Sequence, residues 1–108
     1  MRIIKIFIVV LLFSFSLTIN LKADSEKMAL GLEVYNNKAM CGTCHVLKAA
    51  GSTGDIGPDL DSLKPSEEQV RDVVVEGLGV MPAFGEEGLL TSEEIDAVSY
   101  YVTHSSEK

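Results

Sequence analysis

The feature that most constrains this chain is a pair of cysteines three positions apart, followed directly by a histidine. Cys41 and Cys44 are the only cysteines among the 108 residues, and His45 comes next. Thiols at positions i and i+3 lie on one side of a helical turn, where both sulfurs can reach the two vinyl groups of a porphyrin. The neighbouring imidazole then projects toward the iron. Because this pattern signals covalent c-type haem attachment, we predict one haem c, with its iron ligated by His45.

Two other kinds of site use closely spaced cysteines. A thioredoxin-like dithiol also has a C-x-x-C at a helix start, but its fold needs a βαβ framework, and the sequence shows none. A structural zinc site needs four ligands, typically two such pairs. The chain offers two cysteines and two histidines, and the second histidine, His104, lies in the C-terminal tail. Haem attachment is therefore the favoured interpretation, and a thiol–disulfide oxidoreductase is an alternative.

The first 23 residues have the layout of a secretory signal peptide. A basic start is followed by an almost unbroken apolar run from Ile6 to Ile19, and Ala23 fits the last position before a cleavage site. We predict that residues 1–23 are removed and that residues 24–108 form one domain. The apolar run is near the lower length limit for spanning a bilayer, so a retained membrane anchor is the alternative. In either case the domain is exported, and we expect it in the periplasm.

Charge and size limit what the exported domain can bind. Removal of the signal segment leaves 6 basic and 16 acidic side chains, a formal charge of −10. Such a surface repels phosphate backbones, so nucleic acid is a poor partner, and a protein with a basic or apolar docking face fits better. A domain of this length has a small core. One disulfide between residues three apart would constrain little, so we expect a cofactor to complete that core.

The hydrophobic spacing predicts an all-α domain with long loops. Apolar residues recur every 3–4 positions from Ser25 to Asn36, where an Asn-Asn pair is expected to break the helix. Two further helices are expected to start at Ser66 and Thr91, each followed three residues later by the Gln or Glu of a capping box. Gly77 is expected to end the first of these two helices. The Gly- and Ser-rich residues 50–58 indicate a loop, and no alternating run predicts a strand.

The haem iron needs something on its other face, and three methionines compete for that position. Met40 is adjacent to Cys41 and cannot wrap around the ring, and Met28 has the helical spacing of a core residue. Met81 lies in an irregular segment before a proline that would stiffen the loop presenting the sulfur. We predict Met81 as the sixth ligand, because a thioether raises the reduction potential and leaves no open position. The alternatives are a five-coordinate iron or ligation by His104.

The ring of His45 is expected to be oriented by an acceptor on its second nitrogen. The backbone carbonyl of Pro58 is a candidate, because it follows a Gly-rich loop in which Gly57 would permit close approach to the ring. From these residues alone, an ordinary Gly-Pro turn is the simpler interpretation.

Several segments in a fixed order carry a family resemblance: Gly31 and Tyr35, Cys41–His45, Gly57-Pro58-Asp59-Leu60, Val80-Met81-Pro82-Ala83-Phe84, and Tyr101. Together they resemble the small class I cytochromes c, particularly bacterial monohaem members, over nearly the whole of residues 24–108. The resemblance implies a small cytochrome c fold of about four to five short helices wrapped around one covalently attached haem. It also implies that Pro58 offers its carbonyl to His45 and that Met81 is the sixth ligand.

The resemblance has further consequences and some departures. In the family, a Gly and an aromatic residue of the first helix pack against an aromatic residue of the last helix, which crosses it almost at right angles. The corresponding residues here are Gly31, Tyr35 and Tyr101. The chain has Asp59 where the family often has Asn, and it lacks the Trp that many members carry near the haem propionates. Arg71, Lys64 and backbone amides are candidates to hold the propionates.

The function expected from this resemblance is outer-sphere transfer of single electrons through an exposed haem edge, with no catalysis at the iron. Residues 80–84 would frame an apolar patch around that edge, where a transient redox partner docks through a small interface. The alternative is a cytochrome subunit of a periplasmic oxidoreductase, for example one that oxidises sulfite, in which the partner performs the chemistry.

Overall fold

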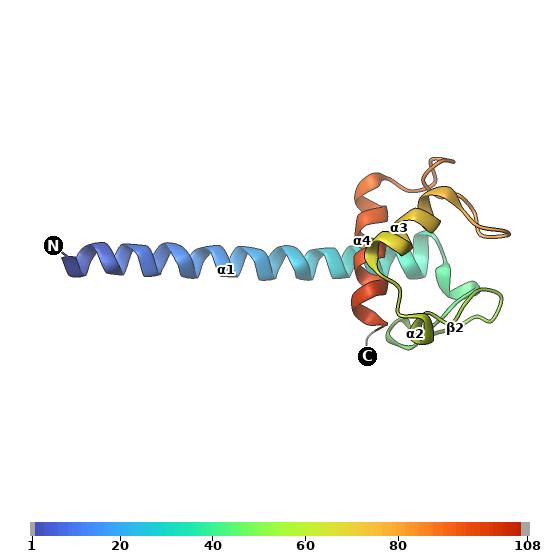
Figure 1. The fold of residues 1–108 in the computed structure, drawn as a ribbon, viewed down its shortest axis with the longest axis horizontal. Helices are drawn as coiled ribbons and strands as arrows, with labels where there is room; N and C mark the ends of the chain where they lie inside the picture. The colour runs from blue at the N-terminus through green and yellow to red at the C-terminus, as the bar shows by residue number, and fades with distance from the viewer. Residues whose placement is uncertain (1, 107–108) are drawn as a thin grey trace.

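The computed structural model describes residues 2–106, and it confirms a mostly helical domain (Figure 1). Two strands of two residues each, missed by the sequence prediction, pair in antiparallel fashion through Val46 with Thr53 and Leu47 with Ser52. In chain order the elements are α1 (Arg2–Glu33), a π-helical turn η1 (Val34–Lys38), a 3-10 turn η2 (Cys41–Thr43), β1 (Val46–Leu47), a 3-10 turn η3 (Lys48–Ala50), β2 (Ser52–Thr53), α2 (Leu60–Leu63), α3 (Glu67–Glu76) and α4 (Ser92–Ser105).

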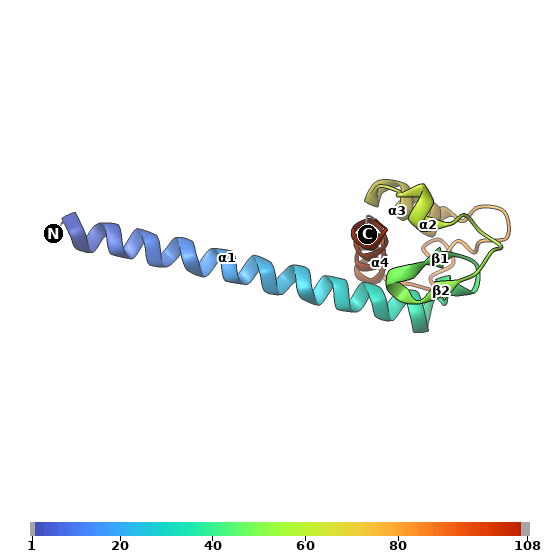
Figure 2. The same ribbon diagram turned by 90° about the horizontal axis from the view of Figure 1, so that it is seen from below.

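Helix α1 together with the π-helical turn η1 extends beyond the sequence prediction at both ends. It is continuous from Arg2, because no Gly or Pro interrupts the chain before Gly31, and its N-terminal part projects from the domain (Figures 1 and 2). The Asn-Asn pair does not break it, since the helix widens into a π-helical turn as far as Lys38. The Asn37 amide donates to the Glu33 carboxylate at 2.8 Å and holds this turn. Among the helices that the structure describes, none is long and apolar enough to cross a bilayer.

Helices α1 and α4 pack by crossing closely at Gly31. A Cβ atom added at Gly31 would lie 2.3 Å from the Ala97 carbonyl oxygen and 2.4 Å from the Tyr101 Cβ. Figure 1 shows α4 running across α1 rather than along it. Next to the crossing, the rings of Tyr35 and Tyr101 lie 6.0 Å apart at 57°. This is the helix contact that the family resemblance implies.

The helix ends follow local capping rules. Ser66 and Thr91 form the two predicted capping boxes, each accepting from the backbone amide three residues later. Gly77 ends α3 with φ 74°, a conformation that suits glycine. The sequence prediction missed α2, whose N-cap is Asp59: this carboxylate accepts from the amides of Asp61 at 2.9 Å and Ser62 at 3.3 Å. The residue that departs from the family pattern therefore opens a helix.

A small core lies where α1, α3 and α4 meet. The guanidinium of Arg71 joins α3 to α4 by donating to the Asp96 carboxylate through Nε at 3.0 Å and Nη2 at 2.8 Å. This propionate candidate is therefore already engaged between two helices. The buried apolar residues of the core are Val34, Tyr35, Leu47, Leu60, Val74, Leu90, Ile95, Val98, Tyr101 and Val102.

Candidate haem site

The Cys41–His45 segment forms a tight turn directly after the first helix. Cys41 begins η2, and its carbonyl oxygen accepts from the amides of Cys44 at 3.1 Å and His45 at 3.0 Å. Met40 enters this turn in the left-handed conformation, with φ 53° and ψ 45°. Both cysteines are partly buried and are not joined by a disulfide. The two thiols are therefore available on one short turn, as thioether attachment requires.

The His45 ring is held on two sides by the loop that precedes α2. Its Nδ1 atom lies 2.7 Å from the Pro58 carbonyl oxygen. Since a carbonyl only accepts, Nδ1 carries the proton, and Nε2 keeps the lone pair that a metal needs. A Cβ atom at Gly57 would lie 2.5 Å from the ring Cε1, so only glycine permits this approach. The Gly57 amide also donates to the Cys44 carbonyl at 2.7 Å, which fastens the loop to the motif.

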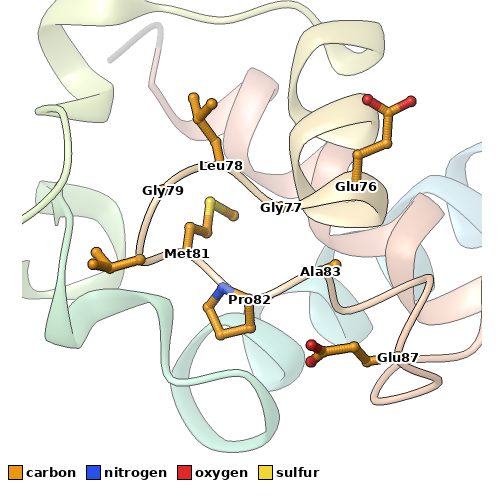
Figure 3. A pocket seen from close by; sticks show the side chains of 9 residues that line it. Glu76, Gly77, Leu78, Gly79, Met81, Pro82, Ala83 and Glu87 are labelled. Atoms are coloured by element: carbon orange, nitrogen blue, oxygen red, sulfur yellow. The ribbon is translucent and has the colours of Figure 1, made fainter.

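Met81 lies on a separate loop, between α3 and α4 (Figure 3). Its amide donates to the Leu78 carbonyl at 3.0 Å, and the Leu78 amide donates back to the Met81 carbonyl at 3.2 Å. At the base of the loop, a Cβ atom at Gly77 would meet the Met81 carbonyl oxygen at 2.9 Å. Met81 is partly buried against the core, as Met28 is on α1, whereas Met40 is 60% exposed. Of these three, only Met81 combines core contact with a loop position.

The contacts therefore join four of the five predicted site residues and leave the fifth on another loop. Cys41, Cys44, His45 and Pro58 are linked by hydrogen bonds through one turn and the loop before α2. Met81 packs against the same core from the loop after α3.

The surroundings of these residues fit a flat apolar cofactor. Five large apolar side chains are 57–85% exposed beside the motif, in the following loop, at the end of α2 and around Met81. A small soluble domain rarely exposes several such side chains together without a ligand or partner to cover them. One thioether sulfur and one imidazole nitrogen are the donors that haem iron takes in electron-transfer proteins. The five side chains are Met40, Ile56, Leu63, Leu78 and Val80.

Sequence reasoning named Tyr35 as a helix contact, but it missed the residues that support the haem motif from the core side: Ser52, Gly42 and Gly54. Tyr35 is fully buried, and its hydroxyl lies 2.8 Å from the Ser52 hydroxyl, which donates in turn to the Leu47 carbonyl at 3.4 Å. Gly42 packs on Ser52, because a Cβ at Gly42 would lie 2.6 Å from the Ser52 Cβ. Gly54 touches the motif backbone at the Thr43 carbonyl, 2.6 Å from an added Cβ. The sequence signal for Ser52, Gly42 and Gly54 was weak, because small residues in loops and turns show no periodicity.

Ionisation of Tyr35 gives a pH-dependent prediction. Burial raises the pKa of Tyr35 to about 12 from its ordinary value of 10.0. The folded state favours the protonated phenol, so this contribution to stability is complete below pH 10 and is lost as the pH rises through about 12. We expect Tyr35→Phe to lower the free energy of unfolding by about 1 kcal/mol at neutral pH. The variant should also lose less stability than the unaltered protein as the pH rises through about 12. Urea unfolding from pH 7 to 12 measures both, and an equally steep alkaline loss in the variant contradicts the assignment.

Fold and motif together define a small helical protein built to hold a haem. The family model described as "Cytochrome C oxidase, cbb3-type, subunit III" matches residues 26–102. A solved structure, the c-type cytochrome SorU from Sinorhizobium meliloti, is 42% identical and superposes with a TM-score of 0.72, over 78% of this chain and 95% of that chain. The chain therefore belongs to the c-type cytochromes, as a small monohaem member. Its cofactor is haem c with iron.

A curated relative supports the same family over a shorter segment. Cytochrome c6 from Microcystis aeruginosa is 47% identical over 45 residues, which is 42% of this chain and 53% of the relative. The chain thus aligns with about half the length of that protein.

Proposed function

We propose that this protein carries single electrons between redox partners through one haem c bound at Cys41 and Cys44 and ligated by His45 and Met81. The observation that carries the proposal is the state of His45. Its Nδ1 is occupied by the Pro58 carbonyl at 2.7 Å, which leaves Nε2 free to bind a metal. When bound, the haem supplies one-electron exchange between ferrous and ferric iron.

The residues of the chain set the conditions for that exchange. Thioethers at Cys41 and Cys44 would keep the cofactor in place, and the Pro58 carbonyl with Gly57 would fix the plane of the His45 ring. The Met81 sulfur, a soft donor, would raise the reduction potential. With both axial positions filled, no site remains for oxygen or substrate, so we assign no catalysis to this chain.

The proposed partner docks at the exposed apolar loop that carries Met81. Val80 is 85% exposed at this loop, and Pro82 is exposed beside it, within the segment Val80–Phe84. Such a patch suits the small, transient interfaces of electron-transfer complexes. The net negative charge of the chain favours a partner whose docking face is basic or apolar.

A second candidate is a cytochrome subunit of a periplasmic oxidoreductase, for example one that oxidises sulfite. The observation that favours it is the family model, whose description names an oxidase subunit. In that arrangement the catalytic partner performs the chemistry and this chain relays the electrons. Co-purification with a catalytic subunit distinguishes it from a freely diffusing carrier.

The thiol–disulfide alternative has less support. Burial raises the pKa of the Cys41 thiol to about 11 from 9.0. Reactive cysteines instead have a lowered pKa, because the thiolate is the nucleophile. Titratable thiols in the protein isolated from cells, together with no covalent haem, would favour this alternative.

We also propose that residues 1–23 are a secretory signal and that residues 24–108 are the exported periplasmic domain. The apolar run and Ala23 support cleavage. Mass spectrometry of the protein from a periplasmic extract should then give a chain that begins at Asp24. A full-length chain found in the membrane fraction would favour the retained anchor.

Acid–acetone extraction tests the proposed function directly. In the periplasmic protein the haem spectrum should stay with the polypeptide, because thioether bonds survive treatment that removes non-covalent haem. The double variant Cys41→Ala/Cys44→Ala should release any haem it binds. If the haem of the unaltered protein is extracted, or none is present, the proposed function is wrong.

A further inference from the structure

The short helix α2 begins at Asp59, directly after the carbonyl that contacts His45. The Pro58 carbonyl oxygen lies 2.7 Å from His45 Nδ1, and Asp59 supplies the amide nitrogen of the same peptide bond. The Asp59 carboxylate accepts from the amides of Asp61 at 2.9 Å and Ser62 at 3.3 Å, and from the Ser62 hydroxyl at 3.2 Å. The capping carboxylate and the carbonyl that orients the imidazole therefore belong to adjacent residues.

Capping accounts for the oxygen atoms of Asp59 but does not require its charge. Asparagine caps a helix about as well as aspartate, because its amide oxygen accepts the same hydrogen bonds. The ion pairs of the described residues 2–106 are Lys38–Glu94 and Arg71–Asp96, and neither of them neutralises Asp59. The carboxylate is exposed, so its charge is available to act on the His45 side of the site.

A negative charge beside the Pro58 peptide acts on His45 in two ways. It makes the carbonyl a stronger acceptor, and a stronger hydrogen bond from Nδ1 makes the imidazole a more basic ligand. It also attracts positive charge, and ferric iron carries one positive charge more than ferrous iron. Both effects favour the oxidised state and lower the reduction potential, whereas the proposed Met81 thioether raises it.

We propose that Asp59 is a positioning residue with two separable roles: its oxygens cap α2, and its charge lowers the reduction potential of the haem through Pro58 and His45. The inference rests on the proposed electron-transfer function and adds a residue that adjusts the driving force of that transfer. Asparagine at this position keeps the cap without the charge. Glutamate keeps the charge but is not among the residues preferred at a helix N-cap, so it weakens the cap.

Asp59→Asn and Asp59→Glu test the two roles on the haem-loaded protein. Each protein is equilibrated at low ionic strength with a fixed mixture of hexacyanoferrate(II) and hexacyanoferrate(III), which exchanges one electron with the iron. Visible absorption then gives the ferrous-to-ferric ratio. In Asp59→Asn we expect this ratio to rise about threefold, an effect that high salt reduces, while the melting temperature stays the same. In Asp59→Glu the ratio should stay within about 1.5-fold of the unaltered protein, while the melting temperature falls.

A matched variant separates the local charge from the overall charge. Glu26→Gln removes one charge from an exposed position on α1, roughly 18 Å along the helical segment from Lys38, which precedes the haem motif. It should leave the ratio within about 1.5-fold of the unaltered protein. An unchanged ratio in Asp59→Asn, or an equal rise in Asp59→Glu or Glu26→Gln, overturns the role of the Asp59 charge alone. Absence of covalent haem from the unaltered protein overturns the proposed function, and this role of Asp59 with it.

Discussion

Replacing Met81 with alanine is expected to abolish the weak absorption band of the ferric protein at roughly 695 nm and to lower the reduction potential by on the order of 100 mV or more. The thioether is a soft donor that favours ferrous iron, and its loss leaves the sixth position to water or to no ligand. Met81 is suited to this role by its place on a hydrogen-bonded loop that packs against the core. Visible spectroscopy and a potentiometric titration measure the two effects.

Met40 provides the matched control. It is also a methionine, it adjoins the motif, and it is 60% exposed. Because it lies beside Cys41 and cannot reach the opposite face of a haem, Met40→Ala should keep both the band and the potential. Persistence of the band in Met81→Ala would remove Met81 from the proposed ligand set.

A second large effect is expected at the helix crossing, where Gly31→Ala should destabilise the folded protein by about 2–4 kcal/mol. The added Cβ would lie 2.3 Å from the Ala97 carbonyl oxygen and 2.4 Å from the Tyr101 Cβ. A backbone carbonyl in α4 cannot rotate away as a flexible side chain can, so the two helices must separate. Urea unfolding of the haem-loaded protein, followed by circular dichroism, measures the loss.

The sign of this effect is informative, because helix propensity predicts the opposite. Alanine in place of glycine favours an isolated helix by about 1 kcal/mol. The control is Ala29→Gly, at an exposed position two residues earlier in α1. It should cost about 1 kcal/mol through propensity alone. If Gly31→Ala proves as stable as the unaltered protein, α1 and α4 do not approach each other closely at Gly31.

Local rules predicted some elements well and others poorly. The starts at Ser66 and Thr91 were correct, because a capping box is a contact between residues three apart in sequence. The end of the first helix was wrong, since the Asn37 side chain bonds back to Glu33 and supports a π-helical turn. Helix α2 was missed because the four residues that follow Asp59 are too few to show a period.

The sequence by itself determined the class of protein. Cys41, Cys44 and His45 are adjacent in the chain, so their chemistry could be interpreted without a fold, and the family comparison confirms a c-type cytochrome with haem c. Met81 was predicted from its position among the methionines, Pro58 was favoured mainly by a resemblance, and both remain proposed roles. The contact of the Pro58 carbonyl with His45 supports one of them.

The tertiary structure alone decided what holds these residues in place. Thirteen positions separate His45 from the Pro58 carbonyl that orients it, and seventeen separate Tyr35 from Ser52 behind the motif. The structure also pairs Glu94 with Lys38, 56 positions away in the sequence, and Arg71 with Asp96. Such contacts join residues that are far apart in the sequence, so the spacing of neighbouring residues does not predict them. The chemistry of the motif is local, whereas its geometry depends on how the loops meet.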